Sequence, residues 1–203
     1  MKDTEHLDDS SLCRWLAGVF FVEVTEEQLA AYIAGAADPF LNRISEISDI
    51  DSLRSDFENE LATLAEMPNT QRVLASDFAA LFLLGEQNNA QPYAGLYTEN
   101  GGTVFGRTHD RMLVLLRERG MARAQQSNEP ADHIAYQLEY LAALLQSADT
   151  GKPEPAWKDF IDAELLNWLP RWEIAFKRVP TRSAFYPLLA KLARSYLEGL
   201  RKT

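Results

Sequence analysis

The sequence predicts an all-α protein, a helical bundle of about eight to ten helices, and three observations carry this prediction. Apolar residues recur at spacings of three and four along nearly all of the 203 residues, which is the period of an amphipathic helix. Runs that alternate polar and apolar residues, which would predict strands, are lacking. The composition is 46% hydrophobic and 25% charged, as in a globular chain that buries its own core.

Each predicted helix is bounded by a start or a stop signal. The first helix begins near Asp8–Ser11, and its apolar stripe consists of Leu12, Trp15, Leu16, Val19 and Phe20. Thr25–Gln28 reads as a capping box for a second helix, which Gly35 would end. Further helices are predicted over 51–66, 70–84, 107–119, 131–148, 156–169 and 181–200, with a short piece after Pro170.

A polar stretch between two strong helices predicts the domain organisation. It separates an N-terminal helical subdomain, residues 1–120, from a C-terminal helical subdomain, residues 131–203, with residues 121–130 as the hinge. Two copies of such a chain can exchange their C-terminal halves, because each half then buries the surface it would bury within one chain. We therefore expect monomers and domain-swapped homodimers.

Charge and cysteine content narrow the function classes. The net charge of −10 argues against nucleic-acid binding, which requires a basic surface. Residues 1–100 carry a net −13 and the remainder +3, which indicates either a basic partner for the first half or an acidic surface that only aids solubility. The single cysteine, Cys13, excludes an internal disulfide and is predicted to be a small core residue.

The beginning of the sequence indicates a cytoplasmic protein. The first nine residues are acidic, whereas a secretory signal starts with positive charge followed by an apolar stretch. The apolar run Leu16–Val22 is far shorter than the roughly 18 residues that suggest a membrane span. We expect no insertion into a membrane.

Two motifs suggest hydrolase chemistry without completing it. His109–Asp110 resembles the metal-binding pair of an all-α phosphohydrolase, but the only upstream histidine, His6, lies near the chain start. Gly101–Thr108, GGTVFGRT, nearly matches a phosphate-binding loop, but Arg107 replaces the lysine and no strand is predicted before it. No catalytic residue and no metal site is predicted, and an all-α phosphohydrolase or nucleotide hydrolase is the alternative function.

A third motif stands where the polar stretch meets a strong amphipathic helix. Glu129 and Asp132 offer carboxylate acceptors, Pro130 stiffens the chain, and His133 titrates near neutrality. Acidic residues in the first turn of a helix also offset its dipole, so the motif is either a ligand site or a helix N-terminus.

The segment EPADHIAYQLEYLAALL, residues 129–145, resembles the E-P-x-D-H signature of the TorD/DmsD/NarJ family of redox-enzyme maturation chaperones. Within that family the chain looks most like the TorD branch, which serves the periplasmic trimethylamine N-oxide reductase. Further blocks match the family in order: CRWLAGVF (13–20), DFAALFL (77–83), QPYAGLY (91–97), NWLPRW (167–172) and FYPLLAKLARSYL (185–197).

The resemblance implies a cytoplasmic, non-catalytic chaperone. Such a protein binds the apo-form of a molybdoenzyme and its twin-arginine signal peptide, assists insertion of the molybdenum cofactor, and delays export. It implies no cofactor of the chaperone's own, since the molybdenum cofactor belongs to the client. Weak GTP binding is associated with some members, and we assign no residues to it.

The resemblance also implies the site. Asp132 and His133 are the expected determinants of signal-peptide and client binding, and the Asp132 carboxylate would accept an arginine of the peptide. Residues expected to act with them, or to line or support a groove, are Glu129, Pro130, Asp77, Phe78, Leu81, Phe82, Pro92, Tyr93 and Tyr97.

Overall fold

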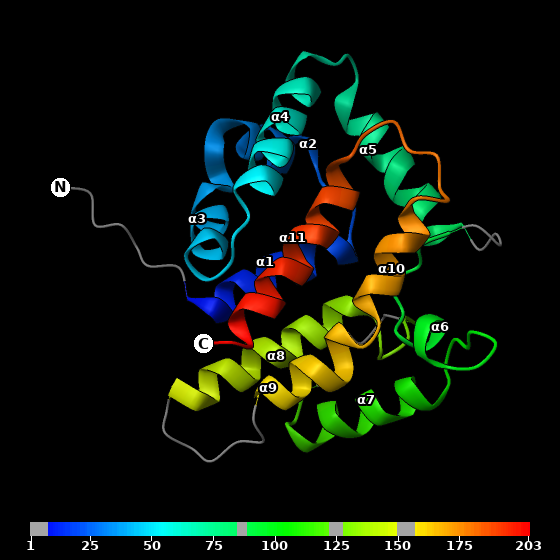
Figure 1. Cartoon of the computed structure of the whole chain (residues 1–203). Helices are drawn as coiled ribbons and strands as arrows, with labels where there is room; N and C mark the ends of the chain where they lie inside the picture. Colours follow the sequence, from blue (N-terminus) through cyan, green and yellow to red (C-terminus); the bar gives the residue numbers. More distant parts are fainter. Residues whose placement is uncertain (1–7, 85–88, 122–127, 150–156) are drawn as a thin grey trace.

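The computed structural model describes residues 8–84, 89–121, 128–149 and 157–203, and within them it is built from helices, which confirms the all-α prediction (Figure 1). Three helices continue into π-helical segments, named η1 to η3. In chain order the elements are α1 Asp9–Phe21, α2 Glu26–Ala31, η1 Tyr32–Ala36, α3 Asp38–Ile47, α4 Asp51–Glu66, α5 Thr70–Phe78, η2 Ala79–Leu83, α6 Gly95–Thr98, α7 Arg107–Glu118, α8 Ile134–Asp149, α9 Trp157–Phe160, η3 Ile161–Leu166, α10 Leu169–Phe176 and α11 Phe185–Leu200.

The predicted capping signals operate as expected at the first two helices. The Asp8 carboxylate accepts the Ser11 N–H at 2.6 Å and begins α1. Thr25 and Gln28 form the reciprocal capping box of α2, with bonds of 3.1 and 2.9 Å. Gly35, with φ of 94°, kinks the chain inside η1 in a left-handed backbone conformation that favours glycine.

The last helix lies in the middle of the fold. In Figure 1, α11 crosses between α3 and α4 on one side and α10 on the other, while α1 lies along α8. A Cβ at Gly199 would collide with Ser48 and Ile47, so glycine permits the closest approach of α11 to α3. The Ser48 hydroxyl donates to the Ser195 carbonyl at 2.7 Å across the same contact. Helix α11 thus joins elements that are far apart in sequence.

One buried apolar cluster extends through the described residues from Leu12 to Leu200. It includes residues of both predicted subdomains, 1–120 and 131–203, so their cores are continuous in this conformation. Residues 122–127 of the predicted hinge lie outside the described residues, and the hinge and the two-subdomain division stay predictions. Across the described ranges, no helix has both the length and the apolarity needed to cross a bilayer.

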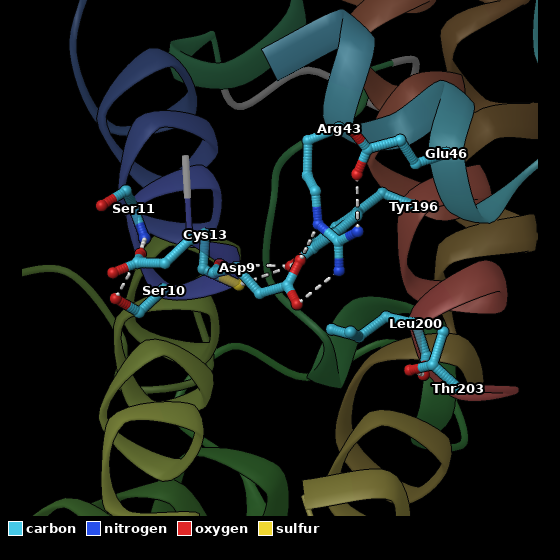
Figure 2. Close-up of polar contacts among 10 residues, drawn as sticks. Asp9, Ser10, Ser11, Cys13, Arg43, Glu46, Tyr196, Leu200 and Thr203 are labelled. Atoms are coloured by element: carbon cyan, nitrogen blue, oxygen red, sulfur yellow. Dashed lines mark hydrogen bonds and ion pairs between the residues drawn. The ribbon is translucent and has the colours of Figure 1, made fainter. Parts of the chain in front are cut away.

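Polar contacts tie the start of α1 to α3 and α11 (Figure 2). The Arg43 guanidinium donates two bonds of 2.8 Å to the Asp9 carboxylate, and the Tyr196 hydroxyl donates to the same residue at 3.2 Å. The Cys13 thiol lies 3.8 Å from that hydroxyl and is fully buried. Burial raises the pKa of Cys13 to about 12, so it is an inert core thiol, as predicted.

Candidate functional site

The E-P-x-D-H turn and the segment that holds Pro92, Tyr93 and Tyr97 meet in space, and we call residues 92–97 with 129–134 the motif junction. Tyr93 and His133 form an isolated antiparallel bridge. The Ala94 N–H donates to the Asp132 carbonyl at 3.1 Å, and the Ile134 N–H donates to the Pro92 carbonyl at 2.9 Å. Backbone bonds therefore join two motifs that lie about 35 residues apart in the sequence.

Asp132 is a buried acceptor within this junction. Its side chain has no exposed surface, and its Oδ2 accepts the Gly95 N–H at 2.8 Å. A Cβ at Gly95 would lie 3.0 Å from that oxygen and would collide with the Thr103 carbonyl, so glycine is required here. The other oxygen, Oδ1, has no hydrogen-bond partner among the described residues, and burial raises the pKa of Asp132.

His133 lies beside Asp132 and is also buried, with 4% of its surface exposed. Its Nδ1 accepts the Ala135 N–H at 3.0 Å. Its ring makes edge contacts with Tyr93 and Phe21, at centroid distances of 5.4 and 5.5 Å. Burial lowers the pKa of His133 to about 3, so the imidazole is neutral at pH 7.

The remaining residues of the junction brace the turn. The Tyr93 hydroxyl donates to the half-buried Glu129 carboxylate, and the Pro130 carbonyl accepts the His133 N–H at 3.1 Å. Tyr97 stacks on Trp168 at 5.5 Å. In this conformation the junction is a folded turn, and neither Asp132 nor His133 presents a surface that a client arginine could contact.

The second group of predicted site residues lies elsewhere, at the end of α5 and in η2. The Asp77 carboxylate accepts the Arg182 and Ser183 N–H groups, each at 2.9 Å, and so fixes the loop before α11. Phe78, Leu81 and Phe82 are buried in the core. We call the following rings, with centroids 5.0 to 6.4 Å apart, the aromatic cluster: Phe20, Phe78, Phe82, Trp172, Phe176 and Tyr186.

The structure thus divides the predicted site residues between the motif junction and the aromatic cluster. The predicted groove of Asp77, Phe78, Leu81 and Phe82 is core in this conformation. At the end of η2, the apolar side chains of Leu83 and Leu84 are more than half exposed. The roles of all these residues in binding a client stay predictions.

Both hydrolase motifs have structural roles. His109 is buried, and its Nδ1 accepts the Ala131 N–H at 2.8 Å, so it supports the motif junction. The described part of the chain holds no cluster of three or more side chains suited to a metal ion. At the N-terminus of α7, the Glu99 carboxylate accepts the Thr108 N–H at 2.9 Å, where a phosphate-binding loop would hold a phosphate. The turn of helix α6, rather than a strand, precedes this loop.

Sequence reasoning missed a groove that begins one turn beyond His133. Its volume is about 230 Å³, and we call it the α1–α8 groove. Two signals could have pointed to it: a glycine inside an apolar helical pattern, and a tyrosine three residues after the motif histidine. The residues that line it are Arg14, Ala17, Gly18, Phe21, Ala135, Tyr136 and Glu139.

Comparison with solved structures finds a redox-enzyme maturation protein from Archaeoglobus fulgidus. The alignment covers 98% of this chain and 99% of that one, with a TM-score of 0.52 and 17% sequence identity. The likeness assigns this chain to the all-helical fold of redox-enzyme maturation proteins.

Sequence comparison identifies the branch of that class. Residues 50–173 match the family described as nitrate reductase delta subunit. The chaperone protein TorD of Vibrio cholerae is 34% identical over 91% of this chain and 86% of its own length, and that of Aliivibrio salmonicida is 29% identical over 91% and 88%. The chain therefore belongs to the TorD family of redox-enzyme maturation chaperones, and it is not an enzyme.

Proposed function

We propose that this chain is the cytoplasmic chaperone of a trimethylamine N-oxide reductase. It binds the apo-form of that molybdoenzyme and its twin-arginine signal peptide, assists insertion of the molybdenum cofactor, and delays export. The observation that carries the proposal is the match to TorD chaperones over nine-tenths of the chain, which includes both motifs of the junction.

We infer from its burial that the motif junction has a positioning role within this function. Asp132 holds the Gly95 N–H, and His133 packs between Tyr93 and Phe21. We expect changes at the pair to alter binding because they displace the surfaces around the junction, whereas a direct arginine contact with Asp132 would require the turn to open. The net charge of −13 in residues 1–100 favours a client segment that carries arginines.

The test is titration of the purified chain with a fluorescent synthetic peptide that carries the reductase's twin-arginine signal. A matched peptide has both arginines replaced by glutamine. We expect the Arg–Arg peptide to bind at least about tenfold more tightly, because loss of a charge-assisted contact costs about 1.4 kcal/mol or more. Equal binding of the two peptides, or no binding, would overturn the proposal.

The double substitution Asp132→Ala with His133→Ala tests the junction itself. We expect affinity for the Arg–Arg peptide to fall at least about tenfold at a temperature where the variant remains folded. Melting curves on the same variant separate the alternatives. A lower melting temperature with unchanged affinity would reduce the pair to a helix N-terminus that serves stability alone.

We also propose that the chain forms domain-swapped homodimers in slow exchange with monomers. The continuous core supports this, since a C-terminal half from either copy would bury the same surface. Shortening the chain between Met121 and Asn128 should block closure within one chain and increase the dimer on size-exclusion chromatography. An unchanged distribution would count against swapping.

A further inference from the structure

We propose that the α1–α8 groove binds a short client segment in which apolar side chains adjoin an arginine, with Glu139 as the carboxylate for that arginine. The inference rests on the proposed function, and it deepens it by naming where the peptide binds. The groove is continuous with the motif junction, because Phe21 contacts both His133 and Tyr136, at centroid distances of 5.5 and 5.6 Å.

Gly18 opens the groove. It is exposed in the interior of α1, and a Cβ built on it would meet no atom within 4 Å. Glycine inside a helix costs roughly 0.5–1 kcal/mol relative to alanine, and no close packing here requires it. A second hollow of about 180 Å³ lies on the other side of α1 and shares Arg14 and Gly18 with the groove. One turn further on, Val22 is 54% exposed, so the apolar surface extends beyond the groove.

The groove is apolar along its length and charged at one end. Ala17 and Ala135 form its buried floor, and Phe21 and Tyr136 form its wall next to the junction. The Tyr136 hydroxyl oxygen is buried and has no hydrogen-bond partner among the described residues. A bound segment of peptide could supply that partner through its backbone.

At the charged end, the guanidinium of a client arginine could replace that of Arg14 beside Glu139. Glu139 lies 3.8 Å from Arg14, a long separation for an ion pair, and both side chains are about two-fifths exposed. Arg14 also donates to the Ser10 hydroxyl at 3.3 Å, so it keeps a partner when it leaves Glu139. Exposed pairs of this kind contribute little stability, and a client arginine that approaches over an apolar floor would form the stronger contact.

Two substitutions test the groove with the Arg–Arg peptide as probe. Gly18→Leu fills the groove with a good helix former, and we expect peptide affinity to fall at least tenfold without a lower melting temperature. Its matched control is Ala62→Leu, which adds a comparable apolar side chain to an exposed position of α4. Glu139→Gln removes the carboxylate charge and should weaken binding several-fold. Its control is Glu58→Gln, since Glu58 pairs with Arg54 on α4.

A double-mutant cycle shows whether Glu139 and the peptide arginines interact. The effect of Glu139→Gln is compared for the Arg–Arg peptide and the peptide with glutamines. We expect the several-fold loss with the first and none with the second. Equal effects on both peptides would overturn the assignment of Glu139.

Photo-crosslinking gives a readout that does not depend on how Gly18→Leu folds. Because Cys13 is buried, a Val22→Cys variant beside the groove offers an accessible thiol for a benzophenone label without filling the groove, and a Ser55→Cys variant on α4 is the control. We expect peptide crosslinks from position 22 and not from position 55. Peptide binding without crosslinks at position 22, or with unchanged affinity in Gly18→Leu, would overturn the groove alone, whereas no binding by the unaltered chain would overturn the proposed function.

Discussion

At the motif junction the buried side chains are polar and held by hydrogen bonds, whereas in the aromatic cluster they are rings held by packing. Asp132 accepts a backbone N–H and leaves one oxygen without a partner among the described residues. Phe82, in contrast, contacts five other rings of its cluster. The resemblance marked both regions as client-binding, yet both are interior.

The difference teaches that the residues of a sequence signature can define a local backbone arrangement without themselves contacting a client. The aromatic cluster stabilises the fold through burial of apolar surface. This contribution to stability is large, and it does not depend on the precise orientation of each ring. The junction specifies one backbone arrangement, because a buried polar group requires its particular partner. We therefore expect client contacts on exposed surface beside these regions, such as the α1–α8 groove.

The largest expected effect is in the aromatic cluster. Phe82→Ala removes a ring that is 2% exposed, and we expect the free energy of unfolding to fall by about 3–5 kcal/mol. Urea denaturation measures this change, with Phe105→Ala, at an exposed ring, as the control. A loss below about 1 kcal/mol would show that the cluster is not tightly packed.

A smaller effect is expected at the junction. Asp132→Ala leaves the Gly95 N–H buried without its acceptor, which should lower the free energy of unfolding by about 1–3 kcal/mol. Asp132→Asn retains an acceptor oxygen and should lose less. If the alanine variant were as stable as the unaltered chain, the buried carboxylate would contribute nothing to the turn.

The smallest effect depends on pH and belongs to His133. Its pKa is about 3 in the folded chain and about 6.5 when unfolded, so the unfolded state binds the extra proton as the pH falls through 6.5. We expect the free energy of unfolding to fall by about 1 kcal/mol between pH 6.5 and 5.5 because of this group. His133→Asn, which can accept the Ala135 N–H, should show a shallower pH dependence in denaturant titrations. If stability depended on pH equally in the unaltered chain and in His133→Asn, the low pKa would not belong to His133.

Periodicity and capping signals predicted most helices, but they did not predict α3 and α6. Helix α4 spans Asp51–Glu66 as predicted, because its apolar spacing and Pro68 are local signals. Helix α3 has no side-chain cap, and it begins three residues after Gly35, where the sequence predicts the end of a helix. The single turn α6 depends on distant partners, since the Thr103 N–H and the Asp132 carboxylate both bond to Gly95.

The sequence placed Tyr93, Asp132 and His133 in one candidate site, but it did not predict that these side chains are buried, and their role in client binding stays a prediction. The motifs at Pro92–Tyr93 and at Asp132–His133 lie together in the structure. The resemblance placed both in one site, but it did not give the backbone bonds that join them. Whether a carboxylate faces solvent depends on the tertiary packing around it. The groove residues Gly18 and Glu139 lie on helices joined only by the fold, and no local pattern links them.

The central place of α11 sets the order in which this chaperone can become active during its own synthesis. During synthesis, α1 through α10 leave the ribosome before α11, the helix against which α3, α4 and α10 pack. Until α11 is made, the apolar faces of those helices are exposed. We expect the core to close only when residues 185–200 have emerged, because these contribute eleven buried residues. We expect nascent chains that stop short of α11 to depend on general holding factors, although the finished protein belongs to a family of chaperones.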